Sequence, residues 1–248
     1  MIAPLLEVRG LCKSYGAIRA VDDVSFDVRP GEIFGVIGPN GSGKTTMFNT
    51  VLGQIAPDAG TIALNGEDIT KLSPRQLSRR GVGRTFQSLQ VFAKMTVRDN
   101  LIVAGQEHHG TMASRIFAPG DNGLGPAADA LLAQFRIDHV ADHRAGELSY
   151  GQQKLVDIAM AFMSKPALVL LDEPCAGVNP SLIGSISHLL VELNQARRSS
   201  FIVIEHNMDF VQRTCHRVMV MVEGRVLAIG TPAEIHANKH VLDAYLGN

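Results

Sequence analysis

The sequence lacks several features that mark nucleic-acid-binding proteins. It contains no tryptophan, and only 5% of its 248 residues are aromatic, which disfavours a platform on which single-stranded bases stack. The 23 lysines and arginines are balanced by 24 aspartates and glutamates, and a formal net charge of −1 predicts no strong basic footprint. We therefore expect no nucleic acid among the partners of this protein.

Cysteine is also scarce, and no secretory signal is visible. Cys12, Cys175 and Cys215 lie far apart and form no CxxC pair. This spacing indicates neither a disulfide framework nor a zinc site, so we expect a reducing compartment. The beginning of the chain has no basic segment followed by a long apolar one, as a secretory signal would.

Long apolar runs are missing as well. None approaches the ~20 residues that a membrane-spanning helix needs; the longest are Ala167–Leu171, Phe201–Ile204 and Val218–Val222. If this protein works at a membrane, another chain must cross it. Apolar residues still make up 46% of the sequence, which is enough for a sizeable core and excludes a disordered chain.

Short apolar segments that end in polar residues recur along the chain. Ile33–Ile37 runs into a glycine-rich loop, Ala167–Leu171 precedes Asp172-Glu173, and Phe201–Ile204 precedes Glu205-His206. Buried strands separated by helix-compatible stretches indicate an α/β fold with a parallel sheet. Ligands bind such sheets at the carboxyl ends of the strands, so we expect all three polar groups at one edge.

The other periodic segments suggest how the chain is organised. Glu7–Gly10 and Val24–Val28 look like short strands, the second with the alternation of a half-buried antiparallel strand. The predicted helices are Lys44–Leu52, Val97–Ala104 and Ala127–Phe135. We expect residues 88–156 to form a helical subdomain inserted into an α/β core made of residues 1–87 and 157–248.

The sharpest motif follows the strand Ile33–Ile37. It reads Gly38-Pro39-Asn40-Gly41-Ser42-Gly43-Lys44-Thr45 and matches the phosphate-binding pattern GxxxxGK[ST]. Its glycines let backbone N–H groups approach a polyphosphate, Lys44 can reach the β- and γ-phosphates, and the Thr45 hydroxyl can bind Mg²⁺. An accidental glycine turn is the alternative, but the preceding strand and the following helical segment favour a phosphate loop.

Two acidic residues and one histidine can complete a hydrolytic site. Asp172, at the end of a buried strand, suits a residue that orders Mg²⁺, and Glu173 can polarise an attacking water as a general base. His206 can position that water and donate a hydrogen bond to developing charge. The alternatives are a surface turn before Pro174 and an ordinary loop histidine.

A second anion-binding turn is indicated near residue 150. Ser149 and Gly151 directly precede a segment with helical apolar periodicity, as at a helix N-terminus that binds an anion. An ordinary helix cap is the alternative. One chain has one phosphate loop, so a second phosphate-binding end is surplus unless it serves a neighbouring chain.

Taken in order, these motifs resemble those of the ATP-binding subunits of ABC transporters over nearly the whole chain. The resemblance implies a P-loop NTPase fold, with a RecA-like core, an antiparallel β subdomain and the inserted helical subdomain, as one ABC ATPase domain spanning residues 1–248. It implies that residues 38–46, including Thr46, bind ATP, and that Ser149, Gly151 and Gln152 belong to the signature motif. Asp172 is then the Walker B metal ligand, Glu173 the catalytic base and His206 the switch histidine.

The resemblance also assigns residues whose chemistry alone is uninformative. Tyr15 matches the aromatic residue that stacks on adenine, although a surface or buried tyrosine is the alternative. Gln87 falls at the Q-loop, where it would contact Mg²⁺ or the catalytic water and link to the membrane partner; a solvated glutamine is the alternative. Ala176–Pro180 fills the D-loop. Tyr150 departs from the pattern, because the signature motif usually has glycine there.

A head-to-tail dimer is implied, with ATP held between Gly38–Thr45 of one chain and Ser149–Gln152 of another. The partners would be integral membrane permease subunits, a second ATPase subunit that is either a copy or a sister chain, and indirectly a substrate-binding protein. The location would be the cytoplasmic face of the cell membrane, peripherally bound. Tyr150 and the segments LDEPCAGVNP and VLDAYLGN resemble subunits for the uptake of branched-chain amino acids or related amides.

Three other functions stay open at this point. The first is an ABC ATPase that drives export of lipid or lipopolysaccharide. The second is a soluble ABC mechanoenzyme that acts on nucleic acid or ribosomes, although such proteins commonly carry two cassettes, a coiled-coil insertion or a zinc module. The third is a regulatory module that binds ATP without hydrolysing it, which the presence of both Glu173 and His206 disfavours.

Overall fold

A six-stranded sheet organises the molecule. The computed structural model describes residues 3–85, 89–106 and 123–246, and the described strands of this sheet follow the order β10-β9-β3-β8-β7-β6. β10 runs antiparallel to β9, and the other pairs are parallel, which confirms the predicted parallel sheet. The strands are β3 (Ile33–Ile37), β6 (Val82–Arg84), β7 (Leu168–Asp172), β8 (Ser200–Ile204), β9 (Arg217–Val222) and β10 (Arg225–Gly230).

A second, antiparallel sheet packs beside the first. Its order is β2-β1-β4-β5, and every pair in it is antiparallel. The antiparallel subdomain implied by the family resemblance is therefore confirmed. Its strands are β1 (Leu6–Tyr15), β2 (Ile18–Val28), β4 (Ala59–Leu64) and β5 (Glu67–Asp68).

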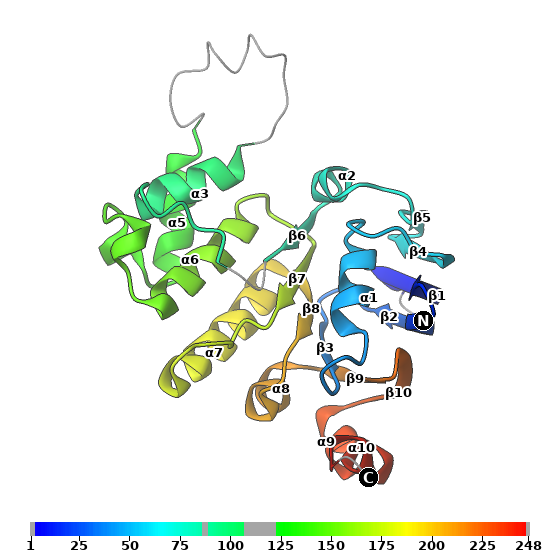
Figure 1. The fold of residues 1–248 in the computed structure, drawn as a ribbon. Coiled ribbons are helices and arrows are strands. Elements are labelled where there is room, and N and C mark those ends of the chain that lie inside the picture. The colour runs from blue at the N-terminus through cyan, green and yellow to red at the C-terminus, as the bar shows by residue number, and fades with distance from the viewer. Residues whose placement is uncertain (1–2, 86–88, 107–122, 247–248) are drawn as a thin grey trace.

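The helices divide between the two sheets and a separate lobe. Figure 1 shows α3, α5 and α6 in a lobe on the left, whereas α1 lies between the two sheets and α7 and α8 lie beside the larger one. No described helix combines the length and apolar character that crossing a bilayer requires. The helices are α1 (Lys44–Val51), α2 (Pro74–Arg79), α3 (Val97–Gly105), α5 (Gly125–Gln134), α6 (Tyr150–Phe162), α7 (Pro180–Arg197), α8 (Met208–Thr214), α9 (Pro232–Ala237) and α10 (Lys239–Leu246).

The larger sheet is buried on both faces, as its continuous apolar strands predict. Successive residues of a strand point to opposite faces. In β3, Ile33 and Ile37 belong to a core shared with the helical lobe, α7 and α8. Phe34 and Val36 belong to a second core, shared with α1 and the antiparallel sheet. The sheet therefore holds the other layers in fixed positions relative to one another.

Several strands differ from the sequence-based prediction in length or position, and others were not predicted. β1 and β2 extend well beyond the predicted Glu7–Gly10 and Val24–Val28, β7 is shifted by one residue, and β8 begins one residue before the predicted strand. β4, β5, β6 and β10 had not been predicted individually. β6 is only three residues long, and β4 begins with Ala59-Gly60, so neither carries a recognisable apolar run.

Phe162 packs the helical lobe against the sheet, and replacing it should destabilise the folded protein. The residue is fully buried in α6, and its ring centroid lies 6.0 Å from that of Phe135 and 5.9 Å from that of Phe201. Phe162→Ala should lower the free energy of unfolding by about 3–5 kcal/mol, because a cavity replaces the ring. Urea denaturation followed by circular dichroism measures this change. Phe162→Leu should lose less, and equal losses for the two variants would contradict the packing described.

Candidate active site

The glycine-rich loop between β3 and α1 requires glycine at particular positions. Gly38 and Gly43 have φ angles of 150° and 94°, a region that side chains rarely adopt. A Cβ on Gly38 would lie 2.1 Å from the carbonyl oxygen of Met221, and one on Gly43 would lie 2.0 Å from that of Ala20. The loop is thus pressed between β9 and β2, and only glycine fits this close backbone approach.

Lys44 begins α1 and folds its ammonium group back over this loop. Its Nζ donates to the carbonyl oxygens of Gly38 at 2.8 Å and Pro39 at 2.9 Å. Burial lowers the pKa of Lys44, and the neighbouring carboxylates of Glu173 and Asp172 oppose that shift. The loop therefore holds a buried positive charge close to the acidic residues that follow β7.

Asp172 is the last residue of β7 and is almost fully buried. Burial is the main cause that raises its pKa, and the neighbouring carboxylate of Glu173 raises it further. Arg84, Lys154 and His206 lower the pKa of Asp172 and so oppose that shift. A buried carboxylate whose pKa is shifted by burial and by nearby charges is of the kind that clusters at functional sites.

Glu173 and His206 meet across the ends of two adjacent strands. Glu173 follows β7, His206 follows β8, and the Nε2 atom of His206 lies 3.0 Å from Oε1 of Glu173. Glu173 also has a φ of 49°, uncommon for a residue other than glycine. The structure thus brings Lys44, Asp172, Glu173 and His206 together at the carboxyl edge of the sheet.

Glu205 organises this edge, although the sequence analysis gave it no role. The residue is buried, and its Oε1 accepts a hydrogen bond from the backbone N–H of Cys175 at 2.8 Å. Its Oε2 accepts from the N–H groups of His206 at 2.8 Å and Asn207 at 3.0 Å. One carboxylate therefore ties the loop after β7 to the loop after β8. Its position directly after a buried strand was the available signal.

Among the other predicted nucleotide and metal ligands, Ser42 is buried, Thr45, Thr46 and Tyr15 are at least partly exposed, and Gln87 lies outside the described residues. Thr45 is exposed and Thr46 half-buried in the first turn of α1. Tyr15 is 49% exposed at the end of β1, and the Nζ of Lys13 lies 5.9 Å from its ring centroid. Gln87 lies outside the described residues.

Oxygen donors are present where a hard cation would need them. The hydroxyl of Thr45 and the carboxylate of Asp172 are the kind of ligand that Mg²⁺ prefers, and Mg²⁺ usually takes only one or two protein ligands besides water and phosphate oxygens. Within the described ranges, no group of three or more His, Cys, Asp or Glu side chains could hold a metal ion by itself. The residues present therefore fit Mg²⁺ bound together with a polyphosphate.

The turn at Ser149 forms a capped helix start. The backbone N–H of Gln152 donates to Ser149 Oγ at 3.4 Å, and the N–H of Ser149 donates to Gln152 Oε1 at 3.1 Å, a capping box. Ser149 is exposed, and Gly151 and Gln152 are half-buried. Figure 1 shows α6 in the helical lobe, on the opposite side of the sheet from α1. The turn therefore starts a helix in a different layer from the helix that follows the glycine-rich loop.

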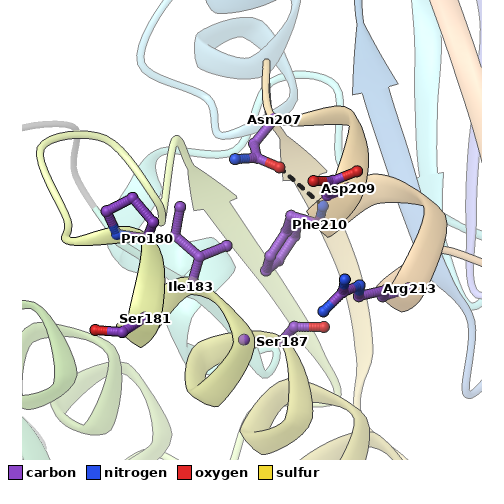
Figure 2. Close-up of a pocket in the computed structure, with 9 residues that line it drawn as sticks. Pro180, Ser181, Ile183, Ser187, Asn207, Asp209, Phe210 and Arg213 are labelled. Atoms are coloured by element: carbon purple, nitrogen blue, oxygen red, sulfur yellow. Dashed lines mark hydrogen bonds between the residues drawn. The ribbon is translucent and has the colours of Figure 1, made fainter.

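One hollow adjoins the site, and another lies among the helices α2, α3 and α6. A cavity of about 310 Å³ lies between α7 and α8 (Figure 2), and Asn207, one of its lining residues, accepts a hydrogen bond from the N–H of Phe210 at 2.9 Å. A larger groove of about 700 Å³ lies where α2, α3 and α6 meet. Among the residues that line this groove are Arg79, Gln90, Phe92, Val103 and Gln106.

Comparison with protein families gives two matches. The model described as "ABC transporter" matches residues 21–176, and the one described as "Branched-chain amino acid ATP-binding cassette transporter" matches residues 225–248.

Named relatives and solved structures match the whole chain. The branched-chain amino acid transport ATP-binding protein BraF of Pseudomonas aeruginosa is 36% identical, with 100% of this chain and 99% of that protein aligned. LivG of Salmonella typhimurium is 37% identical over the same shares. A solved ATP-binding cassette of an ABC transporter in its ADP conformation is 33% identical, with a TM-score of 0.89, and the alignment covers 99% of this chain and 100% of that one. A nucleotide-free cassette is 32% identical, with a TM-score of 0.87 and the same coverage.

Replacing Glu205 should destabilise the carboxyl edge of the sheet. In Glu205→Gln, the amide NH₂ cannot accept a backbone hydrogen bond and the negative charge is lost, so unfolding should become easier by about 1.5–3 kcal/mol. Chemical denaturation measures this. Asp209→Asn, an exposed acid in the first turn of α8, is the matched control and should stay near wild type. Wild-type stability of Glu205→Gln would show that the three contacts are dispensable.

Proposed function

Because this chain belongs to the ABC transporter family, and within it to the branched-chain amino acid subfamily, we propose that it hydrolyses ATP to drive the import of branched-chain amino acids through a membrane permease. The family predicted from the order of the motifs is confirmed. The observation that carries the mechanism is the meeting of Lys44, Asp172, Glu173 and His206 beside the glycine-rich loop. The names of the relatives support import of amino acids over export of lipid.

The glycine-rich loop is the proposed cradle for the triphosphate. Its glycines permit backbone N–H groups to face phosphate oxygens, and the N-terminal end of α1 adds a partial positive charge. Lys44 supplies a full positive charge that burial keeps from bulk water. Tyr15, half exposed at the end of β1, is the proposed stacking surface for adenine. The solved relative in an ADP conformation supports nucleotide binding by this fold.

The residues after β7 and β8 are the proposed hydrolytic machinery. Thr45, Asp172 and Gln87 would hold Mg²⁺, which neutralises charge on the phosphate oxygens when bound. Glu173 is the proposed base that accepts a proton from the attacking water. The contact of 3.0 Å between its Oε1 and Nε2 of His206 supports a role for His206 in positioning that base. Glu205 fixes the backbone of His206.

A second ATPase subunit completes each site in this proposal. The turn at Ser149–Gln152 starts α6 in the helical lobe, whereas the glycine-rich loop precedes α1, and the exposed position of Ser149 favours binding to the nucleotide of another chain. The partner is a second copy or a sister subunit, arranged head to tail. Loss of the bridging γ-phosphate on hydrolysis would then release the pair, a switch of the order-and-closure type.

The groove between α2, α3 and α6 is the proposed docking surface for the permease. One of its lining residues, Gln90, follows the predicted Q-loop residue Gln87 by three positions in the sequence, and the groove combines the exposed ring of Phe92 with the basic side chain of Arg79. Docking there would place the protein at the cytoplasmic face of the membrane, with the substrate-binding protein acting on the permease from the other side. We keep residues 88–156 as the proposed helical subdomain and residues 1–87 and 157–248 as the core, although α6 continues across the second boundary.

The proposed roles of Glu173 and Lys44 predict different effects when each residue is replaced. Glu173→Gln should retain ATP binding but lose at least about a hundredfold in turnover, because the base is removed and the phosphate cradle remains. Lys44→Ala should instead lose ATP affinity. Binding of a fluorescent ATP analogue and phosphate release, measured side by side, test both. Loss of binding in Glu173→Gln, or normal affinity in Lys44→Ala, would contradict these roles.

The docking surface is tested by co-purification with the permease. Phe92→Ala combined with Arg79→Glu should reduce recovery of the permease strongly, since it removes the exposed ring and reverses the charge, and it should leave ATP affinity of the isolated chain unchanged. Ile18→Ala, a 71% exposed apolar residue on β2, is the matched control and should co-purify normally. Undiminished recovery of the permease with the double variant would place docking elsewhere.

A further inference from the structure

Tyr150 stands where the signature motif usually has glycine, and its ring lies against the D-loop of the same chain. A Cβ placed on Gly177 would be 3.1 Å from Cε1 of Tyr150, 3.4 Å from Cζ and 3.5 Å from the hydroxyl oxygen. The edge of the ring therefore occupies the space that a side chain at position 177 would need. Gly177 also has a φ of 71°, so glycine is favoured there on both counts.

A reciprocal contact runs in the other direction. A Cβ on Gly151 would lie 2.3 Å from Cδ2 of Leu182, far closer than atoms can approach. Leu182 belongs to the first turn of α7, directly after the D-loop. The start of α6 thus contributes Tyr150 and Gly151, and the D-loop with the start of α7 contributes Gly177 and Leu182. Each large side chain packs beside the glycine of the other segment.

Both segments are anchored to helices by their own caps. Ser149 caps α6, and Asn179 caps α7 by accepting from the N–H of Ser181 at 3.1 Å. Motion of the start of α6 relative to the start of α7 would separate the two segments without breaking either cap. The Tyr150–Gly177 and Leu182–Gly151 contacts connect the two helix starts. Tightly packed contacts of this kind resist gradual deformation.

We propose that Tyr150 is a positioning residue that locks the signature turn to the D-loop, so that the two segments approach the partner's nucleotide as one unit. The inference rests on the proposed function only in naming that nucleotide; the lock itself is a property of the single chain. Tyr150 is 45% exposed, so packing in the hydrophobic core does not account for the ring. Two of the three Tyr150 atoms nearest to the Cβ position of Gly177 are ring carbons, so we expect the ring rather than the hydroxyl to make the contact.

Hydrogen–deuterium exchange of the isolated, nucleotide-free chain tests the lock directly. Tyr150→Gly restores the usual signature residue and should speed exchange of D-loop peptides covering residues 173–182 by about tenfold, with strands β1 and β2 unchanged as an internal reference. Tyr150→Phe keeps the ring and should match wild type. Leu182→Ala should reproduce the Tyr150→Gly result. Unchanged D-loop exchange in Tyr150→Gly, or exchange raised equally in β1 and β2, would overturn the proposal.

The assembled transporter tests the consequence for hydrolysis. Tyr150→Gly should raise the ATP concentration for half-maximal hydrolysis by roughly two- to thirtyfold, the usual span of coupling changes. ATP affinity of the isolated chain should not change, because Tyr150 lies outside the phosphate loop. Half-saturation that stays at the wild-type value would overturn coupling to the partner's nucleotide. Absence of ATPase activity in the wild-type transporter would instead refute the proposed function and leave the exchange result intact.

Discussion

The parallel pairing of β3, β8 and β7 is the constraint on which the site depends. β8 lies between the other two strands, with Val36 paired to Ile204 and Asp172 paired to Ile204 across the two ladders. Three loops that are distant in sequence consequently leave the sheet side by side. The first carries Lys44, the second Glu173 and the third His206. A shift of either neighbouring strand by one residue would move its loop by about 3.3 Å and separate these side chains.

The buried charged groups at this edge are compensated by neighbouring charges or by hydrogen bonds. Lys44 lies near Asp172 and Glu173, and Asp172 also lies near Arg84 and Lys154. Such groups are costly to bury unless each is compensated by neighbours or hydrogen bonds. Glu205 shows the second form of compensation, because three backbone N–H groups satisfy its carboxylate. The edge can therefore hold its buried charged groups in fixed positions away from bulk water, which electrostatic catalysis requires.

Much of this arrangement was predictable from the sequence, and the reasons for the exceptions are physical. The GxxxxGK[ST] loop, Asp172 and His206 each follow a short apolar strand, so a parallel sheet alone predicts that they meet. Glu205 was missed because its partners are backbone N–H groups, which leave no residue pattern. The contact of Tyr150 with Gly177 was missed because it joins the starts of two helices, and only packing reveals their separation. Strands such as β6 and β4 are too short or too rich in small residues to give an apolar signal.

The central claim is that the triphosphate and its metal bind at the shared edge of β3, β8 and β7. Paramagnetic broadening of backbone amide signals in the NMR spectrum by Mn²⁺ bound with a non-hydrolysable ATP analogue tests this most directly. We expect the amide signals of residues 38, 40–46, 172–173 and 205–207 to disappear, whereas those of α5 and α10 remain. Broadening centred on another surface, or broadening by Mn²⁺ that is the same without nucleotide, would contradict it.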